Sequence, residues 1–152
     1  VGKLKESYLV RAVEEYSKRI GRYATLERIW VPEEPFADSA SPARRDEIRA
    51  AEGRRLLART RPSSFLILCD LEGQEMSSEE FSRFLSELGV GGASDLTFLI
   101  GGPLGVSPEV RERSRARISF SRMTFPHQLM QVMLLEQIYR AFKISRGEPY
   151  HY

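Results

Sequence analysis

The chain has 152 residues, of which 41% are hydrophobic and 29% charged, and its formal net charge is +2 at pH 7. These values are typical of one globular domain, and the small net charge excludes a polycation that binds nucleic acid through bulk charge alone. The printed sequence has one cysteine, no apolar run of about 18 residues and no signal-peptide pattern, so we expect a cytoplasmic protein without a disulfide or a membrane span.

The first half of the chain is expected to contain two helices and a strand. Apolar residues recur at helical spacing over about 5–20, which predicts an amphipathic helix. The β-branched and aromatic residues of 25–31 predict a strand. A surface loop over 32–41 follows, and Ser41 is the expected N-cap of a second helix over about 42–60.

The next stretch predicts a strand, a helix and a strand. Residues 64–70 form a continuous apolar run, as expected for a strand that is buried on both faces of a parallel sheet. Ser77 and Glu80 have the spacing of a capping box for a helix that ends at Gly89. A second buried strand is expected over 95–100.

The last third predicts one more strand between two helices. The Gly-rich loop 101–105 leads to Ser107, which is the expected cap of a helix opened by a proline. A short strand is expected over 118–120, followed by a loop. Pro126 then opens a long helix that continues over 128–144.

Strands that alternate with helices predict an α/β fold with a mostly parallel sheet, in which ligands bind at the carboxyl ends of the strands. Three loops fit that description, at 69–73, 101–105 and 121–125. The glycines of 101–105 are compatible with a tight turn or with a ligand loop. Their spacing matches neither a dinucleotide fingerprint nor a phosphate loop, which disfavours those two functions.

The arginines and histidines of the chain can each have a structural or a functional role. The densest basic segment contains Arg111, Arg113, Arg115, Arg117 and Arg122. Such a segment is either a solvated face or a contact for RNA phosphate. The two histidines, His127 and His151, lack the spacing of a zinc site, so no metal is expected. His127 at a helix start is either structural or functional, and Arg140 can simply pair with Glu136 on the same helix.

The helix after Pro126 is apolar on nearly every face. One face of a helix in a small domain packs on the sheet, so apolar residues on its other faces need a second partner. A copy of the same chain is the simplest partner, and we therefore expect a homodimer. The methionines of this helix are interpreted as packing residues.

Three segments carry a resemblance to a known family. FLIGGPLGVSPEV, SFSRMTFPHQLM and LLEQIYRAFKISRGEPYHY are similar to the bacterial large-subunit rRNA pseudouridine N3-methyltransferase family of the SPOUT superfamily. The resemblance covers nearly the whole chain. Members of this family have an apolar strand ahead of the VGK motif, so the first sheet strand is expected to be truncated here.

The resemblance implies a fold and a cofactor. It implies one Rossmann-like domain over 1–152 with helices on both faces of the sheet, a deep trefoil knot formed by about 95–152, and a homodimer. S-adenosylmethionine would bind in the knot and leave as S-adenosylhomocysteine. The positions that match the cofactor site of the family are Cys69, Gly101, Gly102, Gly105, Phe120, Ser121, Arg122, Met123, Thr124 and Phe125.

The resemblance also implies a reaction, which is methylation of N3 of a pseudouridine in a loop of 23S rRNA on the assembled ribosome. Such a base edge is accessible only when the base is unpaired. His127, and His151 from the partner subunit, are candidates to assist removal of the imide proton. Arg140 would bind phosphate or orient the base, and Tyr150 would stack on it.

Two alternatives to this reading remain. One is a SPOUT enzyme that acts on another RNA such as tRNA, and the other is a non-catalytic RNA-binding or ribosome-associated module of the same fold. The chain also departs from the family pattern at Gln131 and Tyr152, where the family usually has basic residues. These departures concern RNA contacts rather than the cofactor.

Overall fold

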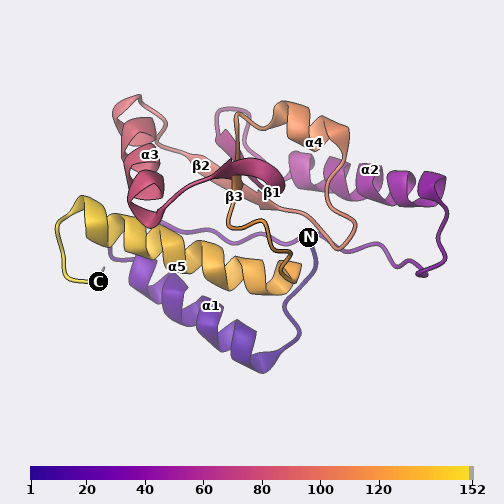
Figure 1. Ribbon diagram of the computed structural model, residues 1–152, viewed down its shortest axis with the longest axis horizontal. Coiled ribbons are helices and arrows are strands. Elements are labelled where there is room, and N and C mark those ends of the chain that lie inside the picture. The colour runs from indigo at the N-terminus through magenta and orange to yellow at the C-terminus, as the bar shows by residue number, and fades with distance from the viewer. Residues whose placement is uncertain (151–152) are drawn as a thin grey trace.

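A three-stranded parallel sheet forms the centre of the molecule (Figure 1). The computed structural model describes residues 1–150. The sheet has the order β2-β1-β3, and its central strand pairs in parallel with both neighbours. The strands are β1 (Phe65–Glu75), β2 (Leu96–Ile100) and β3 (Ala116–Ser119). The predicted α/β class and parallel sheet are therefore confirmed.

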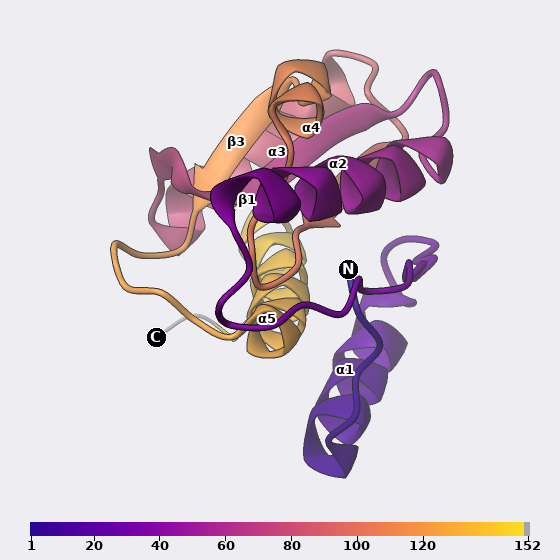
Figure 2. The same ribbon diagram turned by 90° about the vertical axis from the view of Figure 1, so that its right-hand side faces the viewer.

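Helices cover both faces of the sheet (Figures 1 and 2). They are α1 (Ser7–Ile20), α2 (Pro42–Ala58), α3 (Ser78–Val90), α4 (Pro108–Arg113) and α5 (His127–Ser145). In Figure 1, α3 and α5 lie on one side of the sheet and α2 and α4 on the other. α1 lies outside α5, against which it packs. Part of the apolar surface of α5 is thus covered by α1 and α3 within the chain.

The central strand β1 divides the core into two halves, because successive side chains of a strand point to opposite faces. Ile67 is fully buried and packs in a cluster with Phe81 of α3 and Ile118 of β3. Leu66 and Leu68 belong to a second cluster on the α2 and α4 side. Burying each such side chain contributes about 1.5–3 kcal/mol. The prediction that this strand is buried on both faces is confirmed.

The predicted helix caps are present. Ser77 and Glu80 form a reciprocal capping box, in which the Ser77 amide donates to Glu80 Oε2 at 2.7 Å and Ser77 Oγ accepts from the Glu80 amide at 3.2 Å. Ser41 and Ser107 each cap the following helix with a side-chain oxygen. Pro126 is the N-cap of α5 rather than its first residue, so the helix begins one residue later than predicted.

The predicted strand over 25–31 is wrong, because this segment is irregular. A strand is stabilised by cross-strand partners more than by intrinsic propensity. Among residues 1–150, the backbone hydrogen bond that ties this segment to another part of the chain is donated by the Gly2 amide to the Val31 carbonyl at 3.0 Å. Ile29 and Trp30 are more than half exposed, so the segment forms no ladder and buries little apolar surface.

β1 extends beyond the predicted end of its strand at residue 70. Its pairing with β3 breaks after Cys69, opposite Ile118, and resumes at Gln74, which also pairs with Ile118. The four residues between them bulge out of the ladder. Gly73 closes this bulge, where an added Cβ would lie 2.5 Å from the Ile118 carbonyl carbon. The predicted exit loop is therefore a bulge between two paired segments.

The domain bounds of 1–152 and the knot over about 95–152 stay predictions. Within residues 1–150, none of the helices has both the length and the apolar character needed to span a membrane.

Candidate functional site

The carboxyl ends of β2 and β3 and the bulge of β1 open into one cavity of about 750 Å³, which we call the loop cavity. It is lined by residues 69–72, 100–106, 118–121 and 123–127, together with Arg111 and Met130. The cavity lies where ligands bind in parallel α/β sheets, and its volume is that of a small-molecule site.

The glycine loop forms one wall of this cavity with its backbone. The Gly105 amide donates to the Gly102 carbonyl at 2.9 Å, and Gly105 has a φ of +83°. An added Cβ at Gly101 would lie 2.7 Å from Val106 Cγ1 and 3.1 Å from the Gly105 carbonyl carbon. A side chain here would displace the loop. The two interpretations of this loop, a tight turn and a ligand loop, are thus compatible, because the segment forms a turn and also lines a cavity.

A carboxylate with two arginines lies at the bulge of β1. Asp70 lines the cavity and accepts a hydrogen bond from Arg111 Nε at 2.9 Å, while Arg117 Nη1 lies 3.7 Å from the same oxygen. The Asp70 side chain is 8% exposed, so these two cations balance a largely buried charge. Within the basic segment, Arg111 and Arg117 pair with Asp70, and Arg115 lies 5.6 Å from the centre of the Phe65 ring. Arg113, Arg115, Arg117 and Arg122 are all exposed.

Cys69 contributes a protonated thiol to the wall of the loop cavity. Burial raises the pKa of this thiol to about 12. A neutral thiol is a small apolar group and a weak nucleophile. Cys69 therefore shapes the cavity and does not supply a reactive thiolate.

Cys69 should resist alkylation in the folded protein. Treated with iodoacetamide at pH 8, it should react roughly a thousandfold more slowly than in urea, because the thiolate fraction falls by about that factor. Mass spectrometry of the time course measures both rates on the single cysteine of the chain. Folded and unfolded rates within tenfold of each other would contradict the burial of this thiol.

His127 lies at the first turn of α5, on the rim of the loop cavity. Its Nε2 is buried and has no hydrogen-bond partner among the described residues. An added Cβ at Gly2 would lie 3.3 Å from this nitrogen and 3.1 Å from Glu33 Oε2. Burial lowers the pKa of His127, and the Glu33 carboxylate partly offsets that effect. The imidazole is thus neutral at pH 7, and its buried Nε2 lies on the side of Gly2, a residue that does not line the loop cavity.

The lowered pKa of His127 predicts a loss of stability in mild acid. The unfolded histidine titrates near pH 6.5, so the unfolded chain binds the proton first. The free energy of unfolding should therefore fall as the pH drops from about 6.5 to the lower pKa of the folded state. Urea unfolding at pH 7.5, 6.5 and 5.5 measures this slope, which His127→Gln should reduce. An identical slope in the His127 variant would show that another group is responsible.

Arg140 and Tyr150 meet at Glu136 on α5. Arg140 donates to Glu136 Oε1 from Nε at 3.0 Å and from Nη2 at 2.6 Å, and the Tyr150 hydroxyl donates to the same oxygen at 3.2 Å. The Arg140 guanidinium also lies 4.7 Å from the centre of the Tyr150 ring. Burial is the main cause that raises the pKa of Tyr150, so its hydroxyl stays protonated and can donate. Glu136 therefore holds both side chains in one arrangement.

Glu136 also lines a second cavity of about 540 Å³, which we call the helix cavity. Its walls come from α1, α3 and α5 and from the ends of β1 and β3. Residues 118–120 line both cavities.

The structure brings most of the predicted site residues together around the loop cavity. The predicted cofactor positions that line the loop cavity are Cys69, Gly101, Gly102, Gly105, Phe120, Ser121, Met123, Thr124 and Phe125, whereas Arg122 does not line it. Of the predicted catalytic residues, His127 lies at this cavity, while Arg140 and Tyr150 gather at Glu136 beside the helix cavity. His151 lies outside the described residues.

The sequence interpretation missed Asp70, Arg111 and Glu136 as members of the site. Asp70 stands in one of the three predicted ligand loops, which was the signal that could have found it. Arg111 was considered only as part of a basic segment, and Glu136 only as a helix partner for Arg140. Among residues 1–150, no group of three or more His, Cys, Asp or Glu side chains could hold a metal ion.

Comparison with known proteins gives a consistent result along the chain. A family model described as "Predicted SPOUT methyltransferase" matches residues 1–151. A protein of Carboxydothermus hydrogenoformans, named ribosomal RNA large subunit methyltransferase H, is 55% identical over 151 residues, which are 99% of this chain and 95% of that protein.

Proteins with the same name show similar identity in other bacteria. The protein of Clostridium kluyveri is 52% identical and that of Enterococcus faecalis 47%, each over 151 residues that are 99% of this chain and 95% of the relative. The matched length includes every residue that lines the two cavities.

Proposed function

Because this chain belongs to the SPOUT methyltransferase family, we propose that it methylates N3 of a pseudouridine in a loop of 23S large-subunit rRNA. The observation that carries the proposal is the loop cavity, where the ends of β2 and β3, the bulge of β1 and the start of α5 converge. The relatives that match nearly end to end are named as methyltransferases of large-subunit ribosomal RNA, which supports the substrate class.

The residues of the loop cavity fit S-adenosylmethionine as the methyl donor. The cavity volume of about 750 Å³ lies in the range of small-molecule sites. The glycine loop presents backbone rather than side chains, and His127 Nε2 is a buried polar atom without a described partner. Apolar side chains such as Phe120, Phe125 and Met130 complete the wall and exclude water.

Backbone groups of 101–105 and 120–125 would hold the adenosine part of the cofactor. The carboxylate of Asp70, fixed by Arg111, is placed to accept hydrogen bonds from hydroxyl or ammonium groups. When bound, S-adenosylmethionine supplies a sulfonium methyl, so that transfer to the ring nitrogen breaks the carbon–sulfur bond, leaves S-adenosylhomocysteine and releases the imide proton. The protein contributes alignment, which alone is worth several kcal/mol.

Three side chains of the chain are assigned roles in this reaction. His127 is proposed to assist proton removal, because its imidazole lines the loop cavity and its lowered pKa keeps it neutral at pH 7. Arg140 binds RNA phosphate or orients the base, and Glu136 holds its guanidinium in place. Tyr150 presents a ring on which a base can stack. His151 of the second subunit is proposed to assist proton removal.

We further propose that the enzyme is a cytoplasmic homodimer. α5 is partly covered within the chain, but Leu129 and Met130 retain exposed surface at its first turn. Pairing this end of α5 with its copy would bury these side chains.

Mass spectrometry of nucleosides tests the proposed reaction most directly. Ribosomes from a strain that lacks the relevant modification are incubated with the protein and S-adenosylmethionine, and the digested rRNA is analysed for N3-methylpseudouridine. We expect this nucleoside in 23S rRNA at one position. Methylation of tRNA instead would move the target to another RNA, and calorimetry without any cofactor binding would leave a non-catalytic RNA-binding module.

A further inference from the structure

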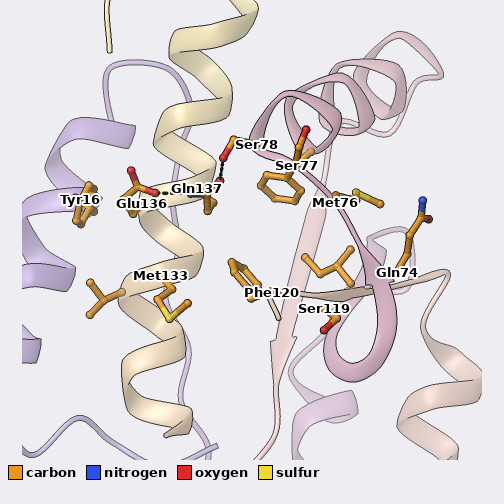
Figure 3. Close-up of a pocket in the computed structure, with 13 residues that line it drawn as sticks. Tyr16, Gln74, Met76, Ser77, Ser78, Ser119, Phe120, Met133, Glu136 and Gln137 are labelled. Carbon is orange, nitrogen blue, oxygen red and sulfur yellow. Dashed lines mark hydrogen bonds between the residues drawn. The ribbon is translucent and has the colours of Figure 1, made fainter. Parts of the chain in front are cut away.

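The helix cavity adjoins the cofactor site assigned above and shares residues 118–120 with it. Figure 3 shows Phe120 and Met133 facing one another across it, with Ser78, Gln137 and Glu136 along one edge. Its volume of about 540 Å³ exceeds what a single aromatic ring needs, and its walls are mixed apolar and polar. These are the properties of a pocket for a flat group with a polar edge.

The two cavities are adjacent. Ile118, Ser119 and Phe120 line both of them, so the end of β3 and the residue after it form a shared wall. Methyl transfer requires that donor and acceptor approach to contact distance. An acceptor site must therefore adjoin the loop cavity, and the helix cavity meets that condition.

A chain of hydrogen bonds fixes the polar edge of the helix cavity. The Ser78 hydroxyl donates to Gln137 Oε1 at 2.7 Å, and Gln137 Nε2 donates to Glu136 Oε2 at 2.7 Å. An amide has two N–H donors and two acceptor lone pairs. The bonds described within residues 1–150 use one of each, which leaves one donor and one acceptor side by side on a fixed group.

A neighbouring donor and acceptor match a base edge in which a carbonyl oxygen stands next to an N–H group. The C2 carbonyl and N1–H of a pseudouridine form such an edge and leave N3 free to receive the methyl group. Unpaired bases also stack on aromatic side chains. Phe120 supplies such a ring in the shared wall. Glu136 lines the same cavity and binds both Arg140 and Tyr150. These two side chains therefore lie beside the cavity, where they can contact the sugar and phosphate of a nucleotide whose base is inside.

We propose that the helix cavity receives the target nucleobase of the RNA, an unpaired pyrimidine-type base, and that Gln137 reads the edge formed by its C2 carbonyl and N1–H. The inference rests on the proposed methyltransferase function. It adds a base site to that function, separate from the cofactor site and with Gln137 as a specificity residue.

The four methionines of the chain provide a test that does not depend on activity. Met76 and Met133 line the helix cavity, whereas Met123 and Met130 line the loop cavity. In the full-length protein labelled with ¹³C at the methionine methyl groups, millimolar pseudouridine should shift the signals of Met76 and Met133. S-adenosylhomocysteine should shift those of Met123 and Met130. Single Met→Leu variants assign the four signals.

The outcomes separate the two proposals. Pseudouridine that shifts only Met123 and Met130, or none of the four, would overturn the base site even if S-adenosylhomocysteine still bound as expected. Failure of S-adenosylhomocysteine to shift Met123 and Met130 would instead count against the proposed cofactor cavity.

An activity measurement with matched variants provides a second test. Gln137→Leu keeps the size of the side chain and removes the amide, and kcat/KM for ribosomes should fall about 10-fold to 100-fold. The Kd for S-adenosylhomocysteine should stay unchanged. Gln128→Leu is the control, because Gln128 is on the same helix but lines neither cavity. Equal activities of the Gln137 and Gln128 variants would overturn the assignment of Gln137.

Discussion

Replacing Arg140 with alanine is expected to lower kcat/KM for rRNA methylation by about 100-fold or more, while the Kd for S-adenosylmethionine stays unchanged. Arg140 lies beside the helix cavity and away from the lining of the loop cavity. Its guanidinium is held by two bonds to Glu136 and lies over Tyr150. The substitution is therefore expected to weaken the interaction with RNA and to leave the binding of the methyl donor unchanged. Radiolabelled methyl transfer and calorimetry measure the two quantities separately.

Arg19→Ala is the matched control for this variant. Arg19 also forms an i,i+4 pair, with Glu15, and its guanidinium also lies over a tyrosine ring, that of Tyr16. Its side chain is 41% exposed, against 24% for Arg140, and the pair contributes little to stability. We expect this variant to retain wild-type activity. If both variants lose activity equally, or if Arg140→Ala weakens cofactor binding, the proposed role of Arg140 is wrong.

Replacing Gly73 with alanine is expected to destabilise the protein by about 3 kcal/mol or more. An added Cβ would lie 2.5 Å and 2.6 Å from two backbone atoms of Ile118 and 2.8 Å from one of Arg117. Backbone atoms of a paired strand cannot move aside as a flexible side chain can, so the ladder between β1 and β3 must open. Because Ile118 lines both cavities, cofactor binding should weaken as well. Urea unfolding monitored by circular dichroism measures the free energy.

Gly89→Ala serves as the control substitution. Gly89 lies in α3, and an added Cβ there meets no atom within 4 Å. Alanine should stabilise this position by about 0.4–1 kcal/mol, because it restricts the unfolded chain and favours the helix. A Gly73 variant as stable as the wild type would mean that the bulge can relax, and would remove the steric reason for glycine at this position.

Local signals in the sequence predicted the helices well. Ser41 and Ser107, each followed by proline, and the Ser77 and Glu80 capping box all cap helices as expected, because a cap depends on residues within one turn of each other. The apolar run of β1 was equally clear, since a central parallel strand is buried on both faces. Such features depend little on the rest of the chain.

Features that depend on distant partners were missed or wrong. The segment 25–31 has strand-forming residues but no ladder, and the continuation of β1 beyond Cys69 depends on a second pairing with β3. Strand formation is decided by neighbours that can be far away in the sequence. The bulge between Cys69 and Gln74 is likewise a property of the pair and not of either strand.

By itself, the sequence determined the α/β class, the helices and their serine caps, the three segments that line the loop cavity and, through resemblance, the SPOUT methyltransferase family. Only the tertiary structure decided that these segments share one cavity, that Asp70 holds Arg111 there, and that Glu136 joins Arg140 to Tyr150 beside a second cavity. Caps, periodicity and turn residues act over a few positions, so they can be read along the chain. A cavity or an ion pair between elements requires that separate segments meet in space, and this follows from the packing of the whole domain.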